Sequence, residues 1–156
     1  MTIEQNFNWS GKFKDKWISQ SIDESCIQYL ENFGYHLCDK KSELDRPGFS
    51  AVTTSQLRNI FSEVKRIEIK VSSTTDADGQ TVSNWDELAT DVLLLRPKIA
   101  YNTARVLAKS QNSRMKDLRA ILEKALSAIK GPEDFERFSQ FMEGIIAYHK
   151  VYGGKD

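Results

Sequence analysis

Apolar residues recur at intervals of three and four over most of the chain, the spacing that gathers side chains on one face of an α-helix. The pattern predicts an all-α protein, a compact bundle of about five helices with no internal repeat. The expected helices run from about residue 23 to 39, from 53 or 54 to about 71, from 84 through 106, from 113 to about 129, and from 132 to about 152.

Capping residues and breakers mark the ends and the irregularities of these helices. Thr53 or Thr54 can accept a backbone N–H as the cap of the second helix, and Asn84 can do the same for the third. Pro97 lies inside the third helix and is expected to kink it, at a cost of about 3 kcal/mol that packing must offset.

Three segments lack the helical period. Residues 1–20 are polar apart from interspersed aromatic residues, which predicts an extended arm whose aromatic side chains pack on the body of the protein or on a neighbour. Residues 40–52 are expected to be a connecting loop, and the small, polar residues 72–83 a mobile loop. The chain therefore divides into an aromatic N-terminal arm, 1–20, and a single helical bundle domain, 21–156.

The composition is that of an ordinary globular domain, since 40% of the 156 residues are hydrophobic, 28% are charged, and the formal net charge is zero. No apolar run approaches the ~20 residues that span a bilayer, and the first residues lack the apolar centre of a signal peptide. We therefore expect a cytoplasmic protein. Cys26 and Cys38 match no zinc or redox spacing and are expected to be small buried side chains, so neither a metal site nor a cofactor is predicted.

The zero net charge conceals a separation of the two signs along the chain. Residues 92–119 contain seven bases and one acid, whereas residues 72–91 contain five acids and no base. A basic block on a neutral chain favours an anionic partner, such as a phosphate backbone. The alternative is an ordinary solvated helix face.

On helices, these bases and those of the second helix fall into two strips, because each residue advances about 100° around the axis. The strip on the second helix consists of Thr54, Arg58 and Lys65. The strip on the third helix consists of Lys98, Asn102, Arg105 and Lys109. If the two helices are neighbours, we expect one continuous groove suited to phosphates, unless each strip only covers the core with its long side chains. Ordinary surface is expected at Arg96, Arg114 and Lys116.

No catalytic constellation can be assembled from this sequence. It contains no phosphate-binding glycine loop, no metalloprotease motif and no nucleophile with an evident histidine base. His149 shares a helix face with apolar residues and is interpreted as a packed or hydrogen-bonded core residue, while His36 has no evident partner. We expect no catalytic residue and no enzyme; an enzyme would require His149 to be exposed beside an acid or a nucleophile.

Three stretches of the sequence resemble one known family. They are VTTSQLRNIF at residues 52–61, LLLRPKIAY at residues 93–101 followed by Arg105, and FMEGIIAYHKVYGG at residues 141–154. In order and spacing they are similar to the small helical subunit of the type III-A CRISPR effector, the Csm complex. The resemblance covers roughly residues 50–154.

The resemblance implies a non-catalytic subunit that stacks in several copies beside RNA-cleaving subunits, in a bundle of about five helices. Such a subunit contacts the backbone of paired guide RNA and target RNA without reading sequence, so its partners are these RNAs, the other subunits and further copies of itself. At the matching positions, the implied RNA contacts are Arg58, Lys98 and Arg105. The same patch extends to Lys65, Lys109 and Arg119. Thr54 and Gln56 are either contacts or helix caps.

The separated charges suggest how copies associate. The acidic parts, residues 23–45 and 72–91, are expected to meet basic parts of a neighbouring copy, since a uniformly basic subunit would repel its own copies. The C-terminal aromatic stretch is assigned to packing within and between copies. A competing interpretation is a structural adaptor between proteins that has no RNA affinity of its own and pairs its basic strips with acidic protein surfaces.

Overall fold

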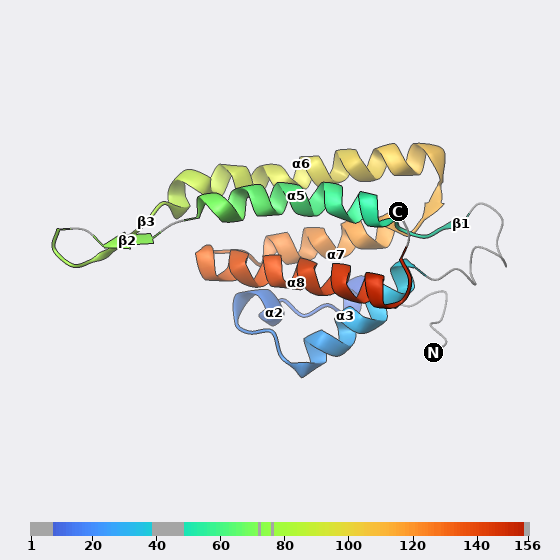
Figure 1. The fold of residues 1–156 in the computed structure, drawn as a ribbon, viewed down its shortest axis with the longest axis horizontal. Helices are drawn as coiled ribbons and strands as arrows, with labels where there is room; N and C mark the ends of the chain where they lie inside the picture. The colour runs from blue at the N-terminus through green and yellow to red at the C-terminus, as the bar shows by residue number, and fades with distance from the viewer. Residues whose placement is uncertain (1–7, 39–48, 72, 76, 155–156) are drawn as a thin grey trace.

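The computed structural model describes residues 8–38, 49–71, 73–75 and 77–154, and within these ranges the chain is mainly helical (Figure 1). The long helices of the described chain are α3 (Glu24–Leu37), α5 (Thr54–Lys70), α6 (Trp85–Lys109), α7 (Met115–Ser127) and α8 (Pro132–Val151). The predicted all-α bundle is confirmed. Most of the loop expected over residues 40–52 lies outside the described residues.

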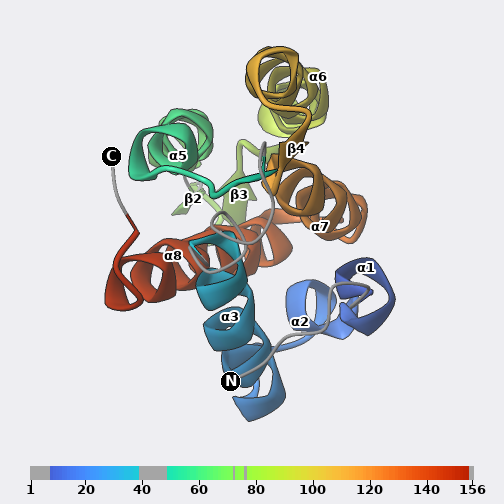
Figure 2. The same cartoon turned by 90° about the vertical axis from the view of Figure 1, so that its right-hand side faces the viewer.

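Helices α5, α6, α7 and α8 run side by side, and α3 packs along the outer side of α8 (Figure 2). Helix α5 contacts α6 and α8, while α6 contacts α5 and α7. Helix α6 therefore lies at the edge of the bundle, with one side turned away from the other helices (Figure 2). Pro97 lies within α6, which continues through it as one helix.

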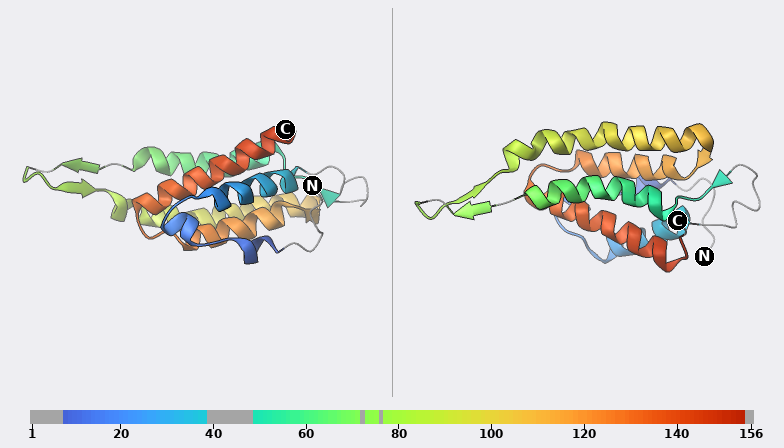
Figure 3. Two further views of the ribbon diagram at one scale, coloured as in Figure 1. Left: turned by 90° about the horizontal axis from the view of Figure 1, so that it is seen from below. Right: turned by 45° about the horizontal axis from the view of Figure 1, so that its top comes forward.

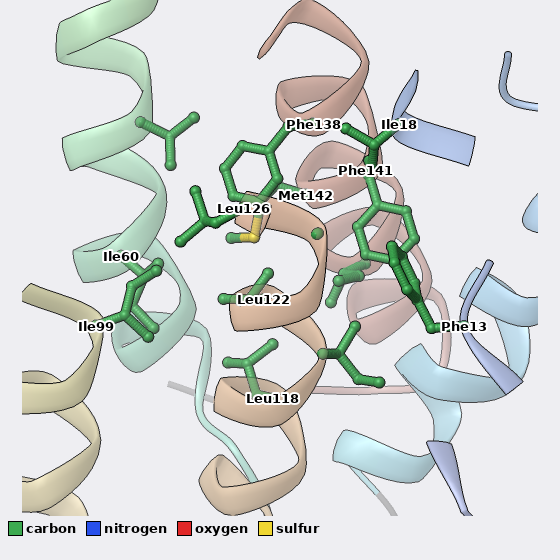
Figure 4. Packing of buried hydrophobic residues seen from close by; sticks show 14 of the residues in the cluster. Phe13, Ile18, Ile60, Ile99, Leu118, Leu122, Leu126, Phe138, Phe141 and Met142 are labelled. Carbon is green, nitrogen blue, oxygen red and sulfur yellow. The ribbon is translucent and has the colours of Figure 1, made fainter. Parts of the chain in front are cut away.

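The core lies between the long helices, and α7 contributes one side of it (Figure 4). Leu118 and Leu122 of α7 are fully buried and point between α8 and the α5–α6 pair (Figure 4). Phe138 and Phe141 of α8 are also fully buried. The aromatic C-terminal helix is therefore part of the core of a single copy.

The N-terminal segment differs from the extended arm that the sequence predicted. It forms two single-turn helices, α1 (Trp9–Lys12) and α2 (Lys16–Ser19). The side chains of Trp9, Phe13 and Trp17 are buried in the main core, so they pack on the body of the protein, one of the two alternatives that the sequence left open. Each ring makes edge-to-face contacts with others, a geometry that the ring quadrupoles favour. The aromatic residues of this segment therefore serve packing within one copy.

The helix ends follow local hydrogen bonding, with one departure from the prediction. Thr53 caps α5 through a capping box, in which its hydroxyl accepts from the Gln56 amide at 3.1 Å and the Gln56 side chain accepts from the Thr53 amide at 2.9 Å. Asn84 precedes α6 but makes no side-chain cap hydrogen bond. The side-chain amide of Asn84 instead donates to the Lys70 carbonyl at 2.6 Å, which ties the start of α6 to the end of α5.

Two small pieces of sheet connect the helices. Strands β2 (Ser73–Thr75) and β3 (Thr81–Ser83) pair as an antiparallel hairpin that projects from one end of the bundle, where the sequence predicted a mobile loop (Figure 3). At the opposite end, β1 (Phe49–Ser50) pairs in parallel with β4 (Asn112–Ser113). This second pairing joins the segment before α5 to the segment after α6. Across the described ranges, no helix combines the length and apolar character needed to cross a membrane.

Candidate nucleic-acid interface

The α5–α6 pair holds the two basic strips, and its packing determines where each strip lies. The buried stripe of α5 includes Leu57 and Val64, and that of α6 includes Leu95 and Ile99, so both helices turn one face into the same core. Their flanks are then held together at the surface, where the Lys98 ammonium lies 3.0 Å from a carboxylate oxygen of Glu63. The polar side chains along the contact between α5 and α6 are therefore held in place by two long, packed helices.

A pocket of about 330 Å³ opens where the N-terminus of α5 meets the C-terminus of α6. Its lining is rich in amide and hydroxyl groups: Ser50, Thr53, Gln56, Asn59, Asn102 and Ser110. Its cationic members are Arg105 and Lys109. Amides, hydroxyls and cations are the groups with which proteins bind phosphate and sugar oxygens, so the lining has the chemistry of a backbone-binding surface.

Both cations of this pocket are exposed on the last turns of α6. The Arg105 guanidinium lies 5.8 Å from the centre of the Tyr101 ring on the same helix, which is within range of a cation–π interaction. Among the described residues, neither Arg105 nor Lys109 forms an ion pair. Their charge is therefore directed into solvent and toward the pocket.

The other residues predicted to bind RNA lie outside this pocket. Lys98 lies at the contact between α5 and α6, where it is paired with Glu63. Lys65 is paired with Glu68 at 3.1 Å and with Glu143 of α8 at 2.8 Å. Arg119 is on α7, where its Nε donates to Glu123 at 2.9 Å, and Arg58 is exposed on α5. The structure therefore separates the predicted residues into several places.

The expectation of one groove shared by both strips is wrong for a geometric reason. Glu63, which meets α6, and Lys65, which meets α8, are two residues apart and point about 200° from one another around α5. Arg58 lies seven residues before Lys65 and so shares its side. Helix α5 therefore stands between the strip of Arg58 and Lys65 and the strip on α6. Thr54, which the sequence placed in the first strip, is buried.

In each of these two ion-paired sites, hydrogen bonding shifts the pKa of one member. The Glu143 and Glu68 carboxylates raise the pKa of Lys65 above its ordinary value. The hydrogen bond from Lys98 lowers the pKa of Glu63, with smaller contributions from charge and from Arg66. An incoming phosphate would therefore have to compete with a carboxylate for either lysine. Arg105 and Lys109 face no such competition from the described residues.

A partly buried polar cluster near the start of α7 was not anticipated from the sequence. The His36 Nε2 lies 2.7 Å from a carboxylate oxygen of Asp117, and the Arg114 guanidinium contacts the His36 ring and donates to the His36 carbonyl at 2.7 Å. His36 therefore has a partner, and Arg114 is buried rather than ordinary surface. The cluster joins the end of α3 to the start of α7, a pairing of distant segments that no local signal in the sequence reveals.

Potential catalytic and metal-binding groups are engaged in packing. His149 is buried, and its Nε2 lies 2.7 Å from the Val52 carbonyl oxygen, as expected for a hydrogen-bonded core residue. Burial lowers the pKa of His149 below its ordinary value. Cys26 and Cys38 are buried free thiols. In the part of the chain that the structure describes, no group of three histidines, cysteines or acids could hold a metal ion.

Comparison with known proteins assigns the chain to a family. The family model described as Csm2 Type III-A matches residues 35–155. The chain is 37% identical over 116 residues to the "CRISPR system Cms protein Csm2" of Streptococcus thermophilus, an alignment that covers 73% of this chain and 84% of the relative. The comparison with solved structures gave no match. The protein therefore belongs to the type III-A Csm2 family, in agreement with the resemblance that its sequence motifs carry.

Proposed function

We propose that this protein is a non-catalytic subunit that binds the sugar-phosphate backbone of RNA, without reading its sequence, through the α6 edge of its bundle. As a member of the Csm2 family it is a small subunit of a type III-A CRISPR complex. The proposed ligands are target RNA and its duplex with guide RNA, and the proposed protein partners are the other subunits and further copies of this chain.

The observation that carries the proposal is the pocket at the end of the α5–α6 pair. It combines two exposed cations, Arg105 and Lys109, with amide side chains of Gln56, Asn59 and Asn102. Contacts from such groups to phosphate and 2′-hydroxyl oxygens carry no sequence information, which suits a subunit that must accept any guide. The Gln56 side chain lines the pocket and also caps α5.

The remaining predicted residues are assigned weaker roles. Lys98 lies on the same helix as Arg105 and Lys109 and extends the RNA-binding surface along α6. To bind RNA, Lys98 releases the Glu63 carboxylate, which Arg66 also contacts. Arg58 and Lys65 lie on the other flank of α5, so they would reach a second stretch of RNA or another subunit. Arg119 is on α7 and outside the pocket.

The proposal is tested by fluorescence anisotropy with labelled single-stranded RNAs of unrelated sequence over a series of salt concentrations. The native protein should bind all of them weakly, with an affinity that falls steeply as salt rises. The double variant Arg105→Glu with Lys109→Glu should lose most of this affinity and reduce the salt slope by about 1.4, because each contact to a single strand contributes about 0.7.

The matched control is Lys116→Glu, a charge reversal at an exposed position of α7 outside the pocket. It should change the affinity little, and the helical circular dichroism of both proteins should equal that of the native chain. Full RNA affinity in the double variant would exclude this pocket.

The adaptor remains the second candidate, and the ion pairs of Lys65 and Lys98 with carboxylates favour it. A pure adaptor would bind no RNA at any salt concentration, yet would form stable complexes with partner subunits. The same anisotropy series therefore separates the two candidates.

A further inference from the structure

We propose that His149 is a positioning residue of the RNA-binding pocket: through one peptide group it orients the Gln56 side chain, so that the NH2 group of Gln56 is presented to a phosphate. This inference rests on the proposed function and deepens it, because it adds to the same pocket a buried residue that does not line it. It is carried by a series of hydrogen bonds whose directions are all fixed.

The peptide group between Val52 and Thr53 connects the core to the pocket. The carbonyl oxygen of Val52 lies 2.7 Å from the Nε2 of His149. The amide of Thr53 donates to the Oε1 of Gln56 at 2.9 Å. This carbonyl and this amide belong to one planar unit, so they turn together. The orientation that His149 gives to the carbonyl is therefore passed to the amide and on to Gln56.

The chemistry of the groups determines which atom donates in each bond. A carbonyl oxygen can only accept, so the Nε2 of His149 must carry the proton. A backbone amide can only donate, so the atom of Gln56 that meets it is the side-chain oxygen and not the nitrogen. Because Gln56 lines the pocket, its NH2 group is the end of the side chain that can serve a ligand there. Such a donor is suited to a phosphate oxygen.

The segment that enters α5 is held from two sides. The Val52 amide donates to the Leu37 carbonyl at the end of α3, at 2.7 Å, while the Val52 carbonyl meets His149 of α8. Gly154 packs so closely on the His149 ring that a methyl group added to it would collide with the ring. The Gly154 amide also donates to the His149 carbonyl at 2.8 Å. The position of the ring, and with it that of the peptide group, is thus fixed by the C-terminal turn.

The orientation of Gln56 matters because a glutamine side chain can present either of its two ends. The oxygen would repel a phosphate, whereas the NH2 group can donate to it. Hydrogen bonds in series polarise one another, so the bond from His149 strengthens the bond that holds the Gln56 oxygen. A side chain that is oriented in advance also loses less freedom when the ligand binds, which raises the affinity.

The first test compares two amides at position 149 by fluorescence anisotropy with labelled single-stranded RNA. The nitrogen of glutamine lies near the place of the histidine Nε2, whereas that of asparagine is one methylene shorter and does not reach the Val52 carbonyl. His149→Asn should weaken binding about two- to tenfold, the loss expected for one neutral hydrogen bond. His149→Gln should recover most of the affinity. Neither variant should change the salt slope, because no cation is lost.

A double-mutant cycle tests whether His149 acts through Gln56. Gln56→Ala removes the donor and should weaken RNA binding by a similar factor. Adding His149→Asn to Gln56→Ala should then weaken binding no further, because the side chain that His149 orients is already gone. Two independent effects would multiply instead.

Three measurements separate positioning from a general loss of structure. Phe138→Leu, at a buried position three turns before His149 on α8, should lower the melting temperature and leave the RNA affinity unchanged. In the native chain, the 15N shifts of the His149 ring should show the tautomer protonated at Nε2. Without RNA, the NMR resonance of the Thr53 amide proton should move upfield in His149→Asn, as its hydrogen bond weakens, and return in His149→Gln.

The proposal is overturned by the opposite tautomer in the native chain, by native RNA affinity in His149→Asn, by a full further loss in the Gln56→Ala background, or by a His149→Gln variant that recovers nothing. In each case, lost affinity in the Arg105→Glu, Lys109→Glu double variant would still support the pocket. A native chain that binds no RNA would overturn the proposed function instead. The Thr53 amide resonance would then still decide whether His149 orients this peptide group.

Discussion

Replacing Gly34 by alanine should destabilise the protein, although alanine is the better helix former. Gly34 is in the last turn of α3, where that helix packs closely on α8. A methyl group added there would lie 2.6 Å from Tyr148 Cβ, and 2.9 Å from both the Tyr148 carbonyl carbon and the His149 amide nitrogen. Two of these three atoms belong to the backbone of α8, so the two helices would have to separate.

The magnitude follows from two opposing effects. Alanine in a helix interior is favoured over glycine by about 1 kcal/mol. Overpacking of a tight contact typically costs about 1–3 kcal/mol, and the upper part of this range applies where rigid backbone must move. The strain therefore exceeds the gain in helix propensity, and we expect a net loss of about 1–2 kcal/mol. For a chain of this size, the melting temperature should fall by about 2–8 °C.

The matched control is Gly144→Ala on the facing helix. A methyl group there would lie 2.6 Å from the Cδ1 of Leu30, the end of a flexible side chain that can change rotamer. The same gain in helix propensity then offsets a smaller strain, so Gly144→Ala should cost less than Gly34→Ala. Both variants are compared with the native chain by urea and thermal unfolding, followed by circular dichroism at 222 nm, the usual helix wavelength. A Gly34→Ala protein as stable as the native one would refute the close approach of α3 to α8.

Two further predictions concern single side chains. Thr53→Ala removes the cap of α5 and should lower the free energy of unfolding by about 0.5–2 kcal/mol in a urea titration, whereas Ser62→Ala on the exposed side of the same helix should change it little. In an NMR titration, the His149 ring should titrate below its ordinary pKa of 6.5, because burial disfavours the charged ring. Since the unfolded chain then binds more protons, this residue should reduce stability as the pH falls below 6.5, and a midpoint above that value would contradict the burial.

The helices could be predicted because their signals are local. The stripe of Leu57, Ile60 and Val64 is buried as its spacing indicated, and the start of α5 is at the predicted threonine cap. The burial of His149 followed from the apolar residues on its helix face. These properties depend on residues within a turn or two of one another, where period and capping are read directly from the sequence.

The N-terminal segment could not be predicted in the same way. Its two helices are only one turn each, too short to be stable alone, and they exist because their aromatic rings fit against α3 and α8. The hydroxyl of Tyr29, for example, donates to the Trp9 carbonyl at 2.9 Å. Such contacts join residues far apart in the chain, and composition alone does not indicate them. The pairing of His36 with Asp117 was missed for the same reason.

The position of the basic strips shows a subtler limit. The sequence predicts that Arg58 and Lys65 share one side of α5, but it does not show which helices cover the other sides. Because α6 packs on the side of Glu63 and α8 receives Lys65, the two strips are separated by α5 instead of being joined. The angular position of a residue on its helix is a local property, whereas its neighbour is a property of the fold.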